Sequence, residues 1–219
     1  MPDERTPPAE RALDATIEEA IDSETKLLAA IAYGEASVDD DPQEVLGIAY
    51  AVSNRSRTWK KTVSEVLKAD PNYTYAANGS NKRFNLLKSS SVAQINKSPA
   101  MRTAVNAAIN AWNGTGNDPS NGAYWWDGLD LKEMRKANPR ISRGFKYGAQ
   151  EHNIYKMDPI LKIVIQYWQV FDKKTGLQVN GAERGRFDTV FISTSARGQT
   201  IFWLYNPDFI KATGAKDYK

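Results

Sequence analysis

Glu35 is the residue whose type and position best suit acid–base chemistry. It follows Leu28 by seven residues and Ile31 by four, so it falls on the apolar face of a helix that we expect to begin with a cap at Ser23. Burial on that face removes water from a carboxyl group and favours its protonated form, which a general acid must carry near neutral pH. The competing interpretation is a carboxylate that faces solvent, or pairs with a Lys or Arg, at a fraying helix end.

Local signals predict further helices that would position Glu35. A second helix is expected from Pro42, capped by Asp41, to about Asn54. A capping box at Thr62 predicts a short helix through Leu67. Another helix is expected to start at Ser98–Pro99 and end at Gly114, whereas residues 70–97 lack a period and are expected to form loops that line a binding groove.

After about residue 158 the spacing of the apolar residues becomes typical of β-strands. This spacing predicts a small antiparallel sheet at the C-terminal end. The expected fold class is therefore α+β. Residues 1–20 are rich in Pro and charge and are expected to form a linker or N-terminal arm. The predicted strands lie in 161–171, 186–193 and 199–206, and the predicted domains are a catalytic core at 21–157 and a β-rich extension packed on it at 158–219.

Composition excludes several kinds of chemistry. The chain has no Cys and one His, His152, which excludes thiolate nucleophiles, disulfides, Cys-type zinc sites and multi-histidine metal sites. A Ser-His-Asp hydrolase is disfavoured because no Gly-x-Ser-x-Gly sequence is present. We therefore expect no metal and no cofactor, and chemistry carried by carboxylates and hydroxyls. The net charge of +3 is too small to identify an anionic partner.

Several short patterns occur in one order around Glu35 and resemble the spore-cortex-lytic-enzyme (SleB-like) cell-wall hydrolase family. They span about residues 27–130, near half of the chain. In this family Arg-Gly-Glu usually follows the GEA sequence, whereas Ser37 through Asp41 follow it here. The patterns are AYGEA at 32–36, VSNR at 52–55, the Ala-rich segment at 107–114, Asp118-Pro119, and GAYWW at 122–126.

The resemblance implies a mostly helical, lysozyme-like core that acts on peptidoglycan. It places Glu35 at the position of the family's catalytic glutamate. The implied activity is that of a muramidase, which cleaves the β-1,4 bond between N-acetylmuramic acid and N-acetylglucosamine by hydrolysis or by lytic transglycosylation.

A glycosidase commonly needs a second carboxylate, although lytic transglycosylases can dispense with it. Glu44 is the best candidate, because the first turn of a helix favours an ionised carboxylate. Glu44 could instead complete a capping box with Asp41, which would be a purely structural role. Asp127 and the acidic run at 39–41 are the other candidates.

Aromatic and polar residues other than Glu35 and Glu44 are candidates for sugar binding. Aromatic rings next to a carboxylate suit a sugar subsite, although Trp more often anchors a core. Asn54 is expected to help hold the helices of the site together. The candidate substrate-binding residues are Asn54, Tyr75, Asn78, Asn81, Arg83, Tyr124, Trp125, Trp126 and Asp127.

Two hypotheses from other classes remain. One is a non-catalytic glycan-binding module, which the intact YGEA at 33–36 argues against. The other is nucleic-acid binding through basic residues, for which no recognition motif is present. These residues are Lys82, Arg83, Arg140, Arg143 and Lys146.

The expected partners are peptidoglycan strands and, for an antibacterial effector, an immunity protein or a delivery machine. No nucleic-acid partner and no membrane anchor is expected, and the chain is expected to be a monomer. Without a recognisable signal peptide, it is expected to reach the periplasm or cell wall by a secretion system, within a longer chain, or by phage lysis.

Overall fold

The computed structural model describes residues 21–133 and 138–217, and the arm expected at 1–20 lies outside them. The fold is mixed α/β, with 46% of the described residues in helices and 20% in strands. It divides into two compact units: unit 1 comprises Met1–Ala123 with Arg197–Thr200, and unit 2 comprises Tyr124–Ala196 with Ile201–Lys219. The chain passes from unit 1 to unit 2 after Ala123, and the 197–200 segment returns to unit 1.

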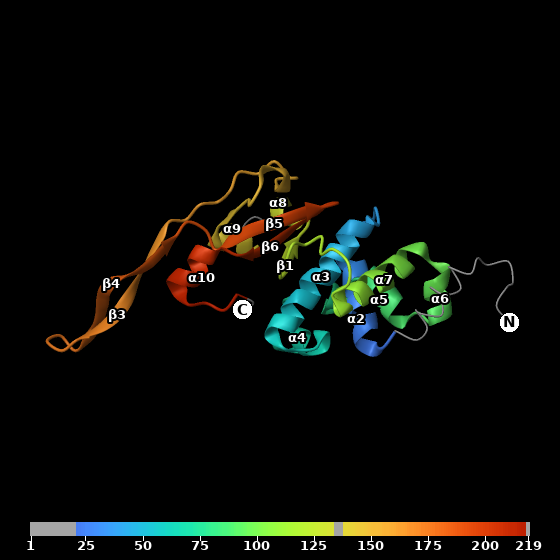
Figure 1. The fold of residues 1–219 in the computed structure, drawn as a ribbon, viewed down its shortest axis with the longest axis horizontal. Helices are drawn as coiled ribbons and strands as arrows, with labels where there is room; N and C mark the ends of the chain where they lie inside the picture. The colour runs from blue at the N-terminus through green and yellow to red at the C-terminus, as the bar shows by residue number, and fades with distance from the viewer. Residues whose placement is uncertain (1–20, 134–137, 218–219) are drawn as a thin grey trace. The chain divides into compact units, whose positions relative to one another are not determined.

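Unit 1 is built around helix α2, which packs against α7, α5 and α3 (Figure 1). Leu28, Ile31 and Ala32 of α2 are fully buried, as the apolar spacing predicted. The helices of unit 1 are α2 (Ser23–Glu35), α3 (Pro42–Trp59), α4 (Val63–Ala69), α5 (Lys82–Ser89), α6 (Val92–Lys97) and α7 (Pro99–Asn113), with a 3-10 turn η1 (Ala76–Asn78).

The N-cap of helix α2 lies one residue before the predicted cap, Ser23. Asp22, and not Ser23, is the N-cap, and its Oδ1 accepts a hydrogen bond from the Thr25 N–H at 2.7 Å. The helix ends at Glu35, because Ala36 has extended backbone angles. Glu35 is therefore the last helical residue, with its side chain held at the boundary between helix and loop.

Helix α3 begins as predicted, with Asp41 as cap and Pro42 in the first position, but runs five residues beyond Asn54. The extension is stabilised by Arg55, which forms an ion pair with Asp70 at 2.8 Å and lies 4.1 Å from the centroid of the Tyr73 ring. These partners are distant in sequence, so local pattern could not reveal them.

The predictions for α4 and α7 are confirmed. Thr62 forms both hydrogen bonds of a capping box at the start of α4, which ends at Ala69, two residues later than predicted. Ser98 caps α7, and Gly114, with φ of 67°, ends it.

The prediction of loops throughout residues 70–97 was wrong. The segment contains η1, α5 and α6, and Asn81 and Ser91 cap the two helices. Each helix is short and buries few large side chains, namely Phe84 and Leu87 in α5 and Ile95 in α6. Each helix has too few turns for a repeating pattern of apolar residues to be visible in the sequence.

Unit 2 contains two sheets instead of the single antiparallel sheet expected. The first has the strand order β1-β6-β5-β2, in which β1 is antiparallel to β6 and β2 is parallel to β5. Trp203 of β6 and Phe145 of the edge strand β2 are fully buried in the hydrophobic core of unit 2, with ring centroids 5.4 Å apart. The strands are β1 (Trp125–Asp127), β2 (Phe145–Lys146), β5 (Phe191–Arg197) and β6 (Thr200–Tyr205), and the short helices are α8 (Asp130–Glu133), α9 (Pro139–Arg143), η2 (Gln150–His152) and α10 (Pro207–Thr213).

The second sheet is a hairpin of β3 (Val164–Asp172) and β4 (Leu177–Phe187). The expected turn follows Asp172, and Gly176, with φ of 72°, supplies its left-handed residue. Helix α10 packs against β4 at the base of the hairpin, as Figure 1 shows. Among the described residues, no helix has the length and apolar character required to cross a bilayer.

Candidate functional site

Two groups from one short segment hold the Glu35 carboxylate. Its Oε1 accepts a hydrogen bond from the Ala76 N–H at 2.5 Å and another from the Thr74 hydroxyl. Thr74 is buried, whereas the Glu35 side chain is half-buried at the end of α2. Because both donors point at the same oxygen, the carboxyl group has a fixed orientation.

The segment after Thr74 also binds the C-terminal end of α2. The Asn81 side-chain amide donates to the Gly34 carbonyl at 2.8 Å, and Arg83 Nε donates to the Tyr33 carbonyl at 2.8 Å. These bonds satisfy carbonyls that have no partner within a helix end, and the Arg83 charge complements the negative end of the helix dipole.

Gly34 is required by this close packing. A Cβ built on it would lie 2.9 Å from the Cβ atoms of both Ala76 and Phe84, a distance that real Cβ atoms essentially never show. The glycine next to Glu35 therefore lets the segment that holds the carboxylate approach the helix.

Arg83 and Asn81 have structural partners instead of the purely groove-lining role that we expected. The Arg83 guanidinium lies 4.0 Å from the centroid of the Tyr33 ring and forms an ion pair with Asp40. Tyr75 differs from both. It lies between the two residues that hold Glu35, and its side chain is 77% exposed. The Tyr75 ring is thus open to solvent, next in sequence to a residue that holds Glu35.

Glu44 is 1% exposed, and both of its carboxylate oxygens accept hydrogen bonds from hydroxyl groups. Oε2 accepts from Ser37 at 2.6 Å and Oε1 from Thr200 at 2.7 Å. The capping box with Asp41 is not formed, because Asp41 caps α3 through the Gln43 N–H. Glu44 instead connects the loop after Glu35 to the 197–200 segment, which favours a positioning role over direct contact with sugar or water.

The acidic residues of the 37–41 loop have partners as well. Asp40 pairs with Arg83, Asp41 caps α3, and Asp39 accepts a hydrogen bond from the Gln199 amide at 2.7 Å. Among the described residues, no group of three or more His, Cys, Asp or Glu side chains could hold a metal ion.

Asn54 organises the segment that follows α7. Its amide nitrogen donates to Asp118 at 2.8 Å and to the Ala123 carbonyl at 3.3 Å, and its oxygen accepts from Arg57 at 2.7 Å. Asp118 in turn accepts from the backbone N–H groups of Ser120 and Gly122. These contacts fit the expected role of Asn54 in holding elements of the site together better than they fit direct substrate binding.

Asp127 of unit 2 is buried in an ionic cluster. Its Oδ2 lies 2.8 Å from Arg140 Nε, and its Oδ1 accepts from the Asn138 amide at 2.6 Å. Burial raises the pKa of Asp127 to about 6, against the opposing effects of Arg140 and Asn138. These partners make Asp127 part of the interior and not an open sugar-binding carboxylate.

The aromatic residues before Asp127 are Tyr124, Trp125 and Trp126, and the first two have identified contacts within unit 2. Trp125 packs on Tyr205, with ring centroids 4.5 Å apart, and meets Phe191 edge-on. The Tyr124 hydroxyl donates to Asp217 at 3.4 Å. All three aromatic residues are half-buried, and Trp125 packs against the hydrophobic core of unit 2.

Three of the five basic residues considered for nucleic-acid binding form ion pairs within the protein. Arg83 pairs with Asp40, Arg140 with Asp127, and Lys146 with Asp188 at 2.9 Å. These charges are compensated locally, which weakens any attraction to a phosphate backbone.

Sequence reasoning missed Thr74, Ser37 and Thr200. Their hydroxyls hold the two glutamates, but isolated Ser and Thr residues carry no spacing signal. The hydrogen bond between Thr200 and Glu44 joins residues 156 positions apart.

Comparisons with known proteins add no relative. No family model, no curated protein and no solved structure matches the chain.

Proposed function

We propose that the chain is a peptidoglycan-cleaving glycosidase, a muramidase in which Glu35 is the general acid. The observation that carries the proposal is the fixed carboxyl group at the end of a buried helix. Thr74 and Ala76 both donate to Oε1, so the orientation of the group is set before any substrate arrives. A preorganised acid avoids the entropic cost of finding its geometry during the reaction.

The geometry suggests how the proton would move. The Glu35 carboxyl group would protonate the glycosidic oxygen as the bond from that oxygen to the muramyl C1 breaks and positive charge develops on the sugar ring.

The second step depends on whether another carboxylate is available. Glu44 is buried between two hydroxyl groups, and Asp127 is buried beside Arg140. Neither is presented as a nucleophile or as a base for water. These observations favour internal attack by the muramyl 6-hydroxyl on C1, with its proton returning to Glu35 and an anhydro end as product. That is lytic transglycosylation, and it consumes no water.

We further propose that unit 1 is a lysozyme-like core. In support, a central helix carries the acid at its C-terminal end and three other helices surround it. The resemblance of the 32–36 and 52–55 patterns to the SleB-like family supports the same assignment. We propose the cell wall as the place of action, since its glycan is the substrate.

A turbidity assay on purified peptidoglycan tests the proposal. We expect the wild-type chain to clear the suspension and Glu35→Gln to clear it at least a hundredfold more slowly, because the amide has the same shape but cannot donate the proton. Glu24→Gln is the matched control, since Glu24 is also on α2 but accepts hydrogen bonds from the N–H and hydroxyl of Ser64 in α4. Equal clearing by Glu35→Gln would refute the assignment.

A glycan-binding module without activity is the second candidate, favoured by the exposed Tyr75 ring. It predicts that the wild-type chain and Glu35→Gln sediment equally with peptidoglycan and that neither clears it.

A further inference from the structure

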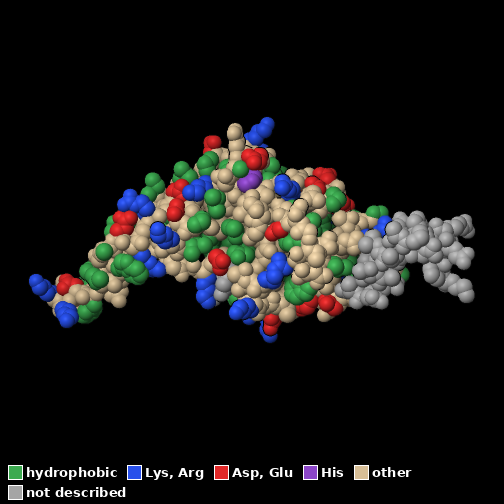
Figure 2. Space-filling view, in the orientation of Figure 1, with side chains coloured by type: hydrophobic (Ala, Val, Ile, Leu, Met, Phe, Trp, Pro, Cys, Tyr) green, Lys and Arg blue, Asp and Glu red, His purple; other side chains and the backbone are tan. Residues whose placement is uncertain are grey.

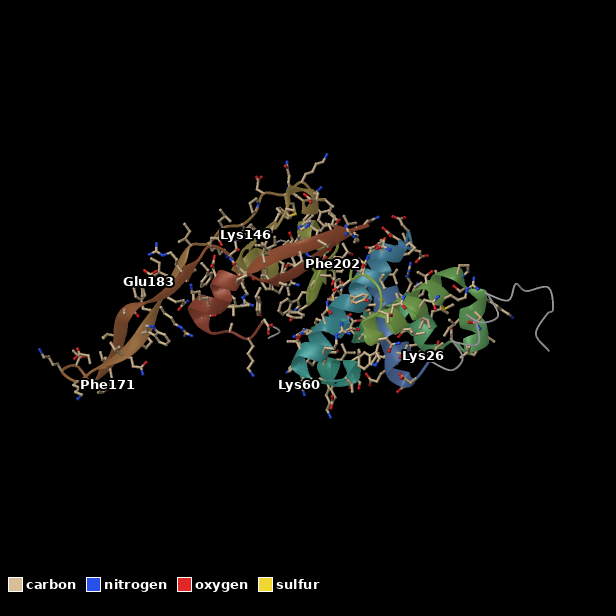
Figure 3. All side chains as sticks on the ribbon, viewed as in Figure 1. Lys26, Lys60, Lys146, Phe171, Glu183 and Phe202 are labelled. Carbon is tan, nitrogen blue, oxygen red and sulfur yellow. The ribbon has the colours of Figure 1, made fainter. Side chains whose placement is uncertain are left out.

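The turn formed by residues 197–200 belongs to unit 1, although the strands β5 and β6 that it joins lie mainly in unit 2. Figure 3 labels Phe202, which lies in β6 two residues after Thr200. Within unit 1, the turn contacts the first turn of α3 and the loop at 37–41, which directly follows Glu35. The hydrogen bonds that make these contacts join residues 156 and 160 positions apart. A late part of the chain therefore lies against the segment next to the proposed acid.

The 37–41 loop depends on contacts from outside it. Asp39, Asp40 and Asp41 are consecutive, and Figure 2 shows Asp and Glu side chains on the surface near the start of α3. Like charges repel each other. Asp40 also has φ of 53°, a left-handed value that few residues other than glycine adopt. Charge repulsion and backbone strain both favour other conformations, so the observed one needs partners in the rest of the fold.

Arg83 of α5 supplies the first set of partners. Its Nη1 donates to the Ser37 carbonyl at 3.4 Å, and its Nη2 pairs with Asp40. The same side chain donates from Nε to the Tyr33 carbonyl at 2.8 Å. Arg83 therefore joins the loop to the last turn of α2.

The 197–200 turn supplies the second set of partners. The Gln199 amide donates to Asp39 at 2.7 Å. The Thr200 hydroxyl donates to Oε1 of Glu44 at 2.7 Å, and Oε2 of Glu44 accepts from the Ser37 hydroxyl at 2.6 Å. Thr200 is 2% exposed and Glu44 is 1% exposed, so water cannot replace a lost donor without a rearrangement of the site.

Gly198 allows the turn to approach Glu44 along the whole side chain. A Cβ built on Gly198 would lie 2.7 Å from Oε2 of Glu44 and 3.1 Å from its Cβ. The backbone of the turn thus covers Glu44 from its first side-chain atom to its carboxylate. Thr200 then donates to the other carboxylate oxygen, so the turn sets the position of the group that binds Ser37.

We propose that the 197–200 turn is a positioning element of the Glu35 site, in which Thr200 acts through Glu44 and Ser37. Glu35 is the last residue of α2, and helix ends fray unless they are bound. The hydrogen bonds to its carboxyl group set the direction of the side chain, whereas the turn holds the backbone that follows it. The effect on catalysis rests on the proposed glycosidase function, whereas the effect on the helix end does not.

Hydrogen exchange followed by NMR tests the effect on the helix end. The Ala36 N–H, which donates to the Ala32 carbonyl at 3.1 Å, reports on the last turn of α2. We expect Thr200→Val to raise its exchange rate at least tenfold relative to that of the Ile31 N–H within the same helix. Thr200→Ser keeps the hydroxyl and should exchange like the wild type.

Thr189→Val is the matched control for loss of a buried hydroxyl. Thr189 is fully buried, and its hydroxyl accepts from the Asn206 amide at 3.3 Å in unit 2. We expect the Ala36 exchange rate of this variant to stay within about twofold of the wild-type rate. All variants are compared at a temperature at which circular dichroism shows them to be folded.

Kinetics of peptidoglycan clearing test the effect on catalysis. Thr200→Val should lower kcat about tenfold and leave KM within twofold, because the acid is displaced while the contacts with substrate are kept. Ser37→Ala should lower kcat by a similar factor. The double variant should be no slower than the slower single variant, because both residues act through Glu44. Thr200→Ser and Thr189→Val should keep the wild-type kcat.

The two measurements separate failure of this inference from failure of the glycosidase function. A wild-type chain that clears no peptidoglycan would refute the glycosidase function. An Ala36 N–H that exchanges in Thr200→Val as in the wild type, or only in step with Ile31, would overturn the positioning role of the turn. Faster exchange with an unchanged kcat would overturn it as well, as would full multiplication of the Thr200→Val and Ser37→Ala losses in the double variant.

Discussion

The hydroxyl of Thr74 donates a hydrogen bond to Oε1 of Glu35, although the two residues are 39 positions apart in the chain. The same oxygen accepts from the Ala76 N–H, so a single turn after Thr74 sets the direction of the carboxyl group. We regard this contact as the structural basis of the proposed acid function.

Removing the Thr74 hydroxyl should therefore impair activity more than stability. We expect Thr74→Val to lower kcat roughly tenfold to a hundredfold, because a hydrogen bond that orients Glu35 is lost while the side-chain volume is kept. The steady-state rate of dye release from labelled peptidoglycan measures kcat. Thr74→Ser should retain most of the activity. Full activity in Thr74→Val would remove Thr74 from the mechanism.

Tyr75 should affect substrate binding with little effect on folding. Its ring is mostly exposed, so Tyr75→Ala should change the free energy of unfolding by less than about 0.5 kcal/mol. We expect glycan binding to weaken about tenfold through loss of stacking on a sugar face, with Tyr75→Phe close to wild type. Calorimetric titration with purified glycan strands measures this difference. Unchanged affinity in Tyr75→Ala would show that Tyr75 is outside the substrate path.

Gly198 approaches Glu44 too closely for a side chain. A Cβ at Gly198 would lie 2.7 Å from Glu44 Oε2, and the residue has φ of +54°. Gly198→Ala should lower the free energy of unfolding by about 2–3 kcal/mol, from left-handed strain and disturbance of the buried carboxylate. Gly116→Ala is the matched control, because Gly116 has positive φ but no atom within 4 Å of a built Cβ. Urea denaturation would contradict this account if both variants lost the same stability.

Asp127 should make stability depend on pH. Its folded-state pKa of about 6 lies above the ordinary value of 3.8, mainly because of burial. The folded protein therefore binds the proton more tightly, and this contribution is complete below about pH 4 and lost as pH rises through 6. The loss is at most about 3 kcal/mol.

Denaturation from pH 4 to 7 measures this dependence. Subtracting the pH profile of Asp127→Asn from that of the wild type isolates the contribution of Asp127, whatever the two proteins' absolute stabilities. A carboxyl ¹³C resonance of Asp127 that titrates near pH 4 would contradict the assignment.

Sequence pattern predicted those parts of the fold that depend on neighbouring residues. The starts of α3, α4 and α7 follow from Asp41, Thr62 and Ser98, because a cap acts within one turn. The burial of Leu28 and Ile31 follows from helical spacing in the same way.

The sequence pattern missed features that depend on partners distant in the chain, and it missed helices that have few turns. The extension of α3 rests on the ion pair of Arg55 with Asp70, and α5 and α6 are too short for a period to emerge. Glu35 could be identified as a candidate, but its orienting partner Thr74 could not. Glu44 was noticed as a second carboxylate, yet the Thr200 hydroxyl that holds it is far away in sequence.

Mass spectrometry of muropeptides released from purified peptidoglycan tests the central claim most directly. We predict products with 1,6-anhydromuramyl ends from the wild-type chain, and none above background from Glu35→Gln. Release of the same products by Glu35→Gln at the wild-type rate would contradict the claim that Glu35 supplies the proton.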